Sequence, residues 1–246
     1  METQQAMGFA HFLAQTDSLA RVLLVVMLVM SVTTWYLIVT KTWAWVLMRR
    51  RTRRFLDIFW NSPSLQAVAA HLEDQHPDEP FSHLAWHGIV AARHHQRHGS
   101  NKLNESGSSA EFLTRSMRRV IDEETARFES GLTVLASIGS TAPFIGLFGT
   151  VWGVYHALIA IGMTGQGTLD KVAGPVGEAL IMTALGLAVA IPAVLAYNFA
   201  VRRNRMVLAQ LDSFAHDLFA FLATGSHVAE AAGVSPLRGT PARGAA

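Results

Sequence analysis

Ionisable and hydroxyl side chains within apolar stretches are the residues that could do chemistry in this sequence. Glu178 directly precedes an uncharged run that extends from Ala179 to Val201. An ionisable group at membrane depth is costly and normally faces a bundle interior or a water-filled cavity, so it indicates function. Gly174 and Pro175 also mark a helix start, where the helix dipole favours a carboxylate that has no further role. Both interpretations of Glu178 stay open from the residues alone.

Two threonines, Thr150 and Thr183, each lie in the middle of a stripe of small residues at helical spacing. A threonine in a membrane helix can bond the carbonyl oxygen four residues earlier and have no other role. Two helices that each place one threonine in the middle of a small-residue face are less easily explained in that way. If the two faces meet, we expect the hydroxyls to form a polar ring with room for water.

The stripes themselves predict close helix packing, because small residues let two backbones approach each other. We expect Pro143 and Pro192 to kink the two helices, with the freed carbonyls satisfied by neighbouring groups. The predicted packing positions are Gly139, Ala142, Gly146, Gly149, Gly153, Gly186 and Ala190.

Two histidine pairs, His83/His87 and His94/His98, have the i,i+4 spacing of metal ligands on one helix face. No glutamate stands within either pair, so the metalloprotease pattern is absent and a solvated helix face is the favoured interpretation. The sequence contains no cysteine, and it shows no phosphate-binding glycine loop, Ser-His-Asp order or carboxylate pair. We therefore predict no enzymatic activity, no cofactor and no metal site.

The apolar content of the chain predicts an all-α integral membrane protein with three transmembrane helices. Half of the 246 residues are hydrophobic and 15% are charged, whereas soluble domains carry about 25% charged residues. The uncharged runs 22–40, 130–169 and 179–201 contain 19, 40 and 23 residues, and about 20 suffice to cross a bilayer. We identify no cleaved signal peptide, so the first span should stay in the protein. The formal net charge of +2 gives no reason to expect nucleic-acid binding.

Basic residues beside the spans predict that the N-terminus lies outside and the C-terminus inside. One cluster directly follows the first span, and a second cluster follows the third. We expect helices two and three to extend into the cytoplasm, the second as one uninterrupted helix from about Ala110. The residues that set this topology are Arg49, Arg50, Arg51, Arg53, Arg54, Arg202, Arg203 and Arg205.

The same patterns divide the chain into segments along its length. In the first half they predict a periplasmic N-terminal segment (1–18), transmembrane helix 1 (19–48), a cytoplasmic helical loop (49–130) and transmembrane helix 2 (131–162). In the second half they predict a periplasmic loop (163–174), transmembrane helix 3 (175–201), a cytoplasmic helix (202–224) and a disordered tail (225–246).

Two motifs resemble the hallmarks of the MotA/TolQ/ExbB proton-channel family. They are Ala142-Pro-Phe-Ile-Gly-Leu-Phe-Gly-Thr-Val-Trp-Gly-Val154 and Gly177-Glu-Ala-Leu-Ile-Met-Thr-Ala-Leu-Gly-Leu-Ala-Val-Ala-Ile-Pro-Ala193, the latter followed by Tyr197-Asn198. The resemblance covers roughly 130–198. The flagellar MotA branch has more spans and shares only a shorter core, so it is set aside. Ala142-Pro-Phe-Ile-Gly and the Ala-, Gly-, Pro- and Arg-rich tail look most like ExbB, whereas Tyr155-His156-Ala157 is similar to TolQ.

The resemblance implies an ExbB-like subunit of the TonB-ExbB-ExbD motor in the inner membrane of a Gram-negative bacterium. Such motors use proton-motive force to energise uptake of siderophores and vitamin B12 across the outer membrane. The implied assembly is a homo-pentamer around an ExbD-like single-span protein that carries the protonatable Asp, with a TonB-like protein attached. Thr150 and Thr183 would be pore-facing hydroxyls near that Asp, and Glu178 would lie at the outer end. We expect the small-residue stripes to line the pore and to leave room for the partner helices.

Two other roles stay open at this point. The chain could be a TolQ-like subunit of the Tol-Pal system, which serves envelope integrity and division. It could also be a passive membrane scaffold that holds the partner helix without contributing to proton passage. Substitution of Thr150 or Glu178 would be silent in a scaffold, whereas bulky residues at Gly146 or Gly153 would block its assembly.

Overall fold

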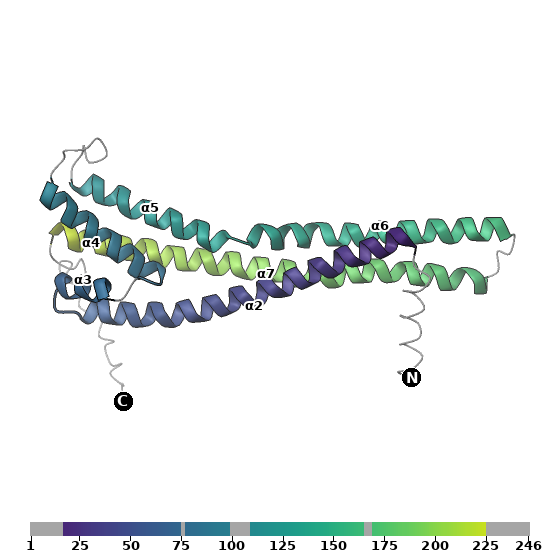
Figure 1. The fold of residues 1–246 in the computed structure, drawn as a ribbon, viewed down its shortest axis with the longest axis horizontal. Coiled ribbons are helices and arrows are strands. Elements are labelled where there is room, and N and C mark those ends of the chain that lie inside the picture. Colours follow the sequence, from purple (N-terminus) through teal and green to yellow (C-terminus); the bar gives the residue numbers. More distant parts are fainter. Residues whose placement is uncertain (1–16, 75–76, 99–108, 165–168, 225–246) are drawn as a thin grey trace, which may run out of the picture. The chain divides into compact units, whose positions relative to one another are not determined.

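The computed structural model describes residues 17–74, 77–98, 109–164 and 169–224 (Figure 1). These residues contain helices and no strand, so the predicted all-α class is confirmed. The helices are α2 (Ser18–Asn61), α3 (Leu65–Asp74), α4 (Pro80–His98), α5 (Ser109–Glu129), α6 (Leu132–Thr164) and α7 (Leu169–Thr224).

Three stretches of helix are long and apolar enough to cross a membrane, which confirms the predicted number of spans. They lie in Ser18–Asn61, Ala110–Met163 and Ala179–Leu222. A helix satisfies its own backbone hydrogen bonds, and this is why a helix can span a bilayer at all. The N-out, C-in orientation stays a prediction.

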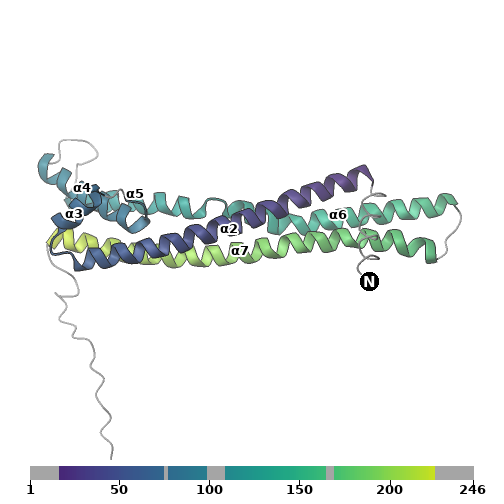
Figure 2. The ribbon, with the colours of Figure 1, turned by 60° about the horizontal axis from the view of Figure 1, so that its bottom comes forward.

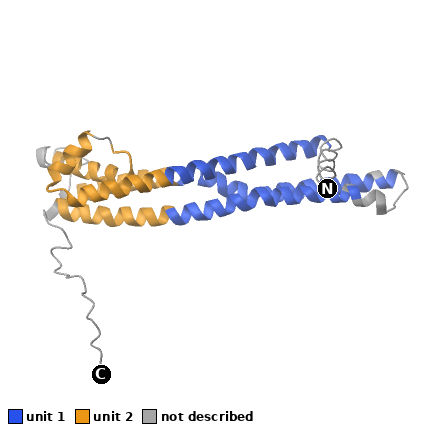
Figure 3. Ribbon diagram, turned by 90° about the horizontal axis from the view of Figure 1, so that it is seen from below, with its two compact units in different colours: residues 1–45, 129–203 blue, residues 46–128, 204–246 orange. Residues whose placement is uncertain are grey.

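The chain divides into two compact units (Figure 3). Unit 1 comprises Met1–Trp45 and Glu129–Arg203, and unit 2 comprises Val46–Phe128 and Asn204–Ala246. Helices α2 and α7 contribute residues to both units. Unit 1 therefore contains the apolar runs, and unit 2 contains most of the charged residues.

Unit 1 is built from the apolar parts of α2, α6 and α7, and α6 and α7 lie side by side in it (Figures 1 and 2). Its core consists of aliphatic and small side chains, and Met27, Leu135 and Ala193 are each at most 2% exposed. Large apolar side chains such as Phe144 and Leu195 are exposed on the outside. Lipid tails or other membrane helices are the surroundings that suit such a surface.

Unit 2 has a separate core formed by the ends of α2 and α7 together with α3, α4 and α5. Phe214 of α7 lies at its centre, with ring centroids 5.1 Å from Phe59 and 5.5 Å from Phe81. Leu211 and Leu218 of α7 are fully buried beside it. Since aromatic rings bury large areas and pack edge to face, this cluster fixes how the short helices pack within the unit.

The expected uninterrupted helix from Ala110 through the second span is wrong at one point. Helix α5 ends at Glu129 and α6 begins at Leu132, and Gly131 between them has φ = 74°. A glycine in this left-handed conformation commonly ends a helix, because it has no Cβ to clash with the backbone. The Asn204 side-chain amide donates to the Phe128 carbonyl at 2.9 Å, which satisfies one of the acceptors left open at the end of α5.

The start of the last helix also differs from the expectation. Helix α7 begins at Leu169, so Gly174 and Pro175 lie inside it and do not mark its start. The backbone of Glu178 lies well beyond the first turn of α7. The predicted segments 1–18, 163–174 and 225–246 fall wholly or partly outside the described residues.

Candidate functional site

The small-residue stripes of α6 and α7 face each other within one chain. A Cβ placed on Gly146 would lie 2.7 Å from the Met182 carbonyl oxygen and 3.1 Å from the Gly186 Cα. A Cβ on Gly186 would lie 2.7 Å from the Ala142 carbonyl oxygen. Distances below 3.0 Å to backbone atoms leave no room for a methyl group, so the two backbones touch at this crossing.

The remaining packing positions extend the contact on both sides of the crossing. A Cβ on Gly139 would lie 2.5 Å from Val194 Cγ2, and a Cβ on Gly153 would lie 2.8 Å from Ala179 Cβ. Gly149 contacts the flexible Met182 side chain, which can move away more easily than backbone. Two further packing positions, Ala142 and Ala190, are 0% and 4% exposed.

Thr150 and Thr183 meet at this seam, one from each helix. Their hydroxyl oxygens are in direct hydrogen-bond contact. Thr150 Oγ1 also lies 3.1 Å from the Gly146 carbonyl oxygen and 3.2 Å from the Ala179 carbonyl oxygen. Thr183 Oγ1 has no other hydrogen-bond partner among the described residues. Because carbonyl oxygens only accept, Thr183 donates to Thr150, and Thr150 donates onward to a carbonyl.

Thr150 and Thr183 are each partly buried, so part of each residue is open at the surface of unit 1. The pair is the only place in the described α6–α7 seam where two side-chain hydroxyls meet. The stripes around it are filled by the chain's own helices, so they leave no gap between α6 and α7 for a further helix. Small residues at this spacing thus serve contact within one subunit, and the expected pore lined by the stripes of several subunits stays a prediction.

The other sequence-predicted residues lie apart from the hydroxyl pair or are only partly described. Glu178 lies in α7, and its side chain is outside the described residues. Pro143 and Pro192 lie inside α6 and α7. Their roles, like those of the two threonines, stay predictions.

The basic residues make contacts that the sequence did not predict. Arg51 forms an ion pair with Asp78, with Nη1 3.1 Å from Oδ2. The Arg203 guanidinium lies 4.5 Å from the centroid of the Trp45 ring and 5.1 Å from that of Phe199. A guanidinium over an aromatic face is an attractive pair, so Arg203 also ties α7 to α2 within unit 1.

In unit 2, one of the two histidine pairs contacts acidic residues of α5. His83 Nδ1 lies 2.9 Å from Glu124 Oε1, and Arg127 donates to the same oxygen at 2.9 Å. His87 stacks edge to face on His83, and its pKa is lowered by burial and by the neighbouring His83 charge. Among the described residues, no three His, Cys, Asp or Glu side chains are placed to hold a metal ion.

Glu79, which directly precedes α4, was likewise not predicted from the sequence. Its carboxylate accepts from the backbone N–H groups of Phe81 and Ser82 and, across the unit, from Thr52 Oγ1 at 2.7 Å. Burial raises the pKa of this carboxyl. The signal in the sequence was an acidic residue just before Pro80, since proline is favoured at the first helical position.

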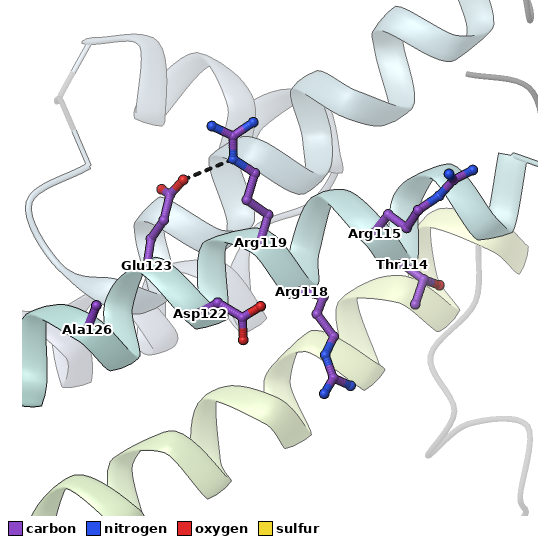
Figure 4. Close-up of a pocket in the computed structure, with 7 residues that line it drawn as sticks. All are labelled: Thr114, Arg115, Arg118, Arg119, Asp122, Glu123 and Ala126. Carbon is purple, nitrogen blue, oxygen red and sulfur yellow. Dashed lines mark hydrogen bonds and ion pairs between the residues drawn. The ribbon is translucent and has the colours of Figure 1, made fainter. Parts of the chain in front are cut away.

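One open concavity runs along the exposed face of α5 (Figure 4). It is lined by Arg115, Arg118 and Arg119 together with Asp122 and Glu123, and the dashed line in the figure joins Arg119 to Glu123. The Arg119 hydrogen bond holds the pKa of Glu123 below its ordinary value. Three arginines and two carboxylates are interspersed along this face, so it is not a patch of one sign and gives no reason to expect a strongly charged ligand.

Comparison with known proteins gives the chain its relatives. Residues 86–213 match the model of the MotA/TolQ/ExbB proton channel family. The biopolymer transport protein ExbB of Xanthomonas campestris pv. campestris is 46% identical over 230 residues, which covers 90% of this chain and 91% of the relative. The ExbB protein of Neisseria meningitidis serogroup A is 43% identical, covering 79% and 87%. The Tol-Pal system protein TolQ of Pseudomonas aeruginosa is 33% identical, covering 81% and 86%.

Proposed function

This chain belongs to the MotA/TolQ/ExbB proton channel family, and we propose that it is the ExbB-type subunit of a proton-driven inner-membrane motor. The observation that carries the ExbB assignment is the 46% identity to an ExbB protein over nine-tenths of the chain, against 33% to a TolQ protein. The family is one of channels and transport proteins, which agrees with the absence of a catalytic motif in the sequence.

The Thr150–Thr183 pair is the feature of this chain that suits a role in proton transfer. The runs 130–169 and 179–201 contain no Asp, Glu, Lys or Arg, and the threonine hydroxyls do not ionise near neutral pH, so the hydroxyl pair needs a carboxylate from a partner to carry the proton. We propose that an ExbD-like single-span protein supplies an aspartate to the open edge of the hydroxyl pair. Thr183 can turn its hydrogen from Thr150 to the ionised carboxylate, and its oxygen can accept from the protonated one.

The driving force of the proposed motor is sufficient for such a step. Moving one elementary charge through 100 mV provides roughly 2.3 kcal/mol. Protonation neutralises the partner aspartate, and this changes which subunit of a homo-pentamer it prefers. The resulting rotation is passed to a TonB-like protein, which energises uptake of siderophores and vitamin B12 across the outer membrane.

A deletion strain with plasmid complementation tests this assignment. The strain is scored for growth under iron limitation and, in parallel, for detergent sensitivity and cell chaining. Loss of iron-limited growth alone, restored by the wild-type gene, supports the ExbB role. Detergent sensitivity and chaining with normal iron-limited growth would instead assign the chain to the TolQ role.

Two observations make the TolQ role the second candidate. TolQ relatives match four-fifths of the chain, and Tyr155-His156-Ala157 is similar to TolQ. A passive scaffold is separated from both by paired variants. Thr150→Val and Glu178→Gln leave a scaffold's function intact, whereas a subunit that takes part in proton transfer loses function with Thr150→Val while its assembly persists.

A further inference from the structure

A cluster at the beginning of α2 contacts the second half of α6, away from the Thr150–Thr183 pair. The Trp152 indole Nε1 donates to Asp17 Oδ2 at 3.3 Å. His156 Nε2 lies 3.9 Å from the same carboxylate oxygen, and the His156 ring stacks on Trp152 with centroids 4.5 Å apart. We name Asp17, Trp152 and His156 the Asp17 cluster.

The Asp17 carboxylate has two separate tasks in this geometry. Oδ1 accepts from the Ser18 backbone N–H at 2.8 Å, and the Asp17 carbonyl accepts from the Arg21 N–H at 3.0 Å. Asp17 is therefore the N-cap of α2. Oδ2 accepts the hydrogen bond from Trp152 and so connects Asp17 to α6. The pKa of Asp17 is lowered, first by the Ser18 hydrogen bond and then by that of Trp152, so the carboxylate stays charged in neutral solution.

The hydrogen bond on the other side of the His156 ring determines where its proton lies. Nδ1 is 3.1 Å from the Trp152 carbonyl oxygen. A carbonyl oxygen only accepts, so Nδ1 carries the hydrogen, and neutral His156 presents a bare Nε2 to the Asp17 carboxylate. Two acceptors then face each other. Protonation places an N–H at Nε2, and the same geometry becomes an ion pair.

We propose that Asp17 is a positioning residue for α6 whose hold on that helix is strengthened when His156 takes up a proton. Trp152 provides a constant part of the contact, and His156 provides a part that depends on pH. In the proposed N-out orientation this cluster lies on the side from which protons enter. The consequence for transport rests on the proposed function, whereas the contact itself does not.

The charged and titratable groups around His156 agree with this assignment. Directly before α2, Asp17 attracts the protonated ring, and Arg21 of α2 acts on the Asp17 carboxylate. From α6, Tyr155 packs edge to face on the ring with centroids 5.4 Å apart. Among the described side chains of α7, none forms an ion pair or ring contact with His156.

The test uses the full chain in lipid nanodiscs, labelled with 5-fluorotryptophan and followed by ¹⁹F NMR between pH 5 and pH 8. The Trp152 resonance is identified by its loss in Trp152→Phe. We expect this resonance to shift with pH in a single step, and we expect the step to vanish in His156→Gln. Because the assay contains no partner and measures no uptake, its outcome is separate from that of the proposed function.

Asp17→Asn then isolates the charge, because asparagine keeps the N-cap and an acceptor for Trp152. The step should become smaller, because the protonated His156 ring then has no carboxylate to pair with. Asp17→Glu, which keeps the charge, should restore the step. A Trp152 resonance that does not respond to pH, or a step of the same size in Asp17→Asn as in the wild type, overturns the proposal.

Discussion

At the scale of single residues, the hydroxyl pair makes the same prediction for both threonines. Thr183→Val and Thr150→Val both remove the proton link between the two oxygens while keeping the side-chain shape. If the pair takes part in proton transfer, energised uptake should fall at least about tenfold in both variants, as is typical for loss of a proton-transferring group. Iron uptake measured in the complemented deletion strain checks this.

Serine substitutions are the matched controls for the threonine variants, because serine retains the hydroxyl and loses only a methyl group. Thr150→Ser and Thr183→Ser should retain most of the uptake. Assembly of all four variants is followed by native gel electrophoresis, so that loss of the complex is not mistaken for loss of proton transfer. Normal uptake in both valine variants would show that the hydroxyls have only a packing role.

His87 gives a prediction for the pH dependence of unit 2. Its pKa lies below the ordinary value of 6.5 because of burial and the neighbouring His83 charge. Between these two values the unfolded chain binds more protons than the folded chain, so stability falls as the pH decreases through this window. Above pH 6.5 His87 is neutral in both states and does not reduce the free energy of unfolding of unit 2. On acidification below that pH, the cost of protonating the partly buried ring lowers this free energy.

Hydrogen exchange of α4 and α5 amides, corrected for intrinsic rates, measures this effect. Protection in the wild type should decrease from pH 7 to pH 5, and His87→Gln should weaken that decrease. His71→Gln in α3 controls for the loss of a histidine elsewhere in the unit. An equally steep decrease in His87→Gln would mean that other groups cause it.

At the scale of elements, the crossing of α6 and α7 depends on two glycines. Gly146→Ala and Gly186→Ala each place a methyl group 2.7 Å from a backbone carbonyl oxygen, which cannot rotate away. We expect each to destabilise unit 1 by about 1–3 kcal/mol, the usual cost of overpacking. Thermal unfolding in detergent is the measurement.

Gly162→Ala is the control for the crossing glycines, because a Cβ at Gly162 meets nothing within 4 Å. Alanine is the better helix former by about 1 kcal/mol, so this variant should be neutral or slightly more stable. Equal destabilisation by all three substitutions would contradict the role assigned to the crossing.

The sequence predicted the elements that depend on patterns along the chain, and it missed contacts between distant residues. The spans were predictable because an uncharged run of sufficient length has few alternatives, and the two threonines because their stripes repeat at helical spacing. The contacts of Trp152 with Asp17 and of His83 with Glu124 join residues 135 and 41 positions apart. No periodicity connects such residues, so these contacts appear only once the helices are packed.

The break between α5 and α6 at Gly131 is another feature that the local sequence did not predict. The sequence around it has the composition of a continuous helix, and glycine is tolerated inside helices at a modest cost. What ends α5 is the positive φ of Gly131, together with the Asn204 amide on the Phe128 carbonyl. The second of these comes from α7 and could not be seen from the local sequence.

At the scale of the whole molecule, the direction in which the chain crosses the membrane determines which ends of the spans meet the proton source. Five arginines follow the first span between Arg49 and Arg54, and Arg202, Arg203 and Arg205 follow the third. Basic residues remain on the cytoplasmic side during insertion. The chain is therefore expected to have its N-terminus outside and its C-terminus inside.

The absence of cysteine from the sequence makes this orientation directly measurable, because a single introduced cysteine is the only thiol. Met163 lies near the end of α6 and is 78% exposed. The thiol of the Met163→Cys variant should therefore react with an impermeant maleimide added to spheroplasts. Asp122→Cys on α5 and Ser213→Cys on α7 should react only after the membrane is opened. The opposite pattern would reverse the orientation and place the Asp17 cluster on the cytoplasmic side, where it could not respond to the pH of the proton source. The proposed pH response of the cluster and the direction of the chain therefore depend on the same labelling result.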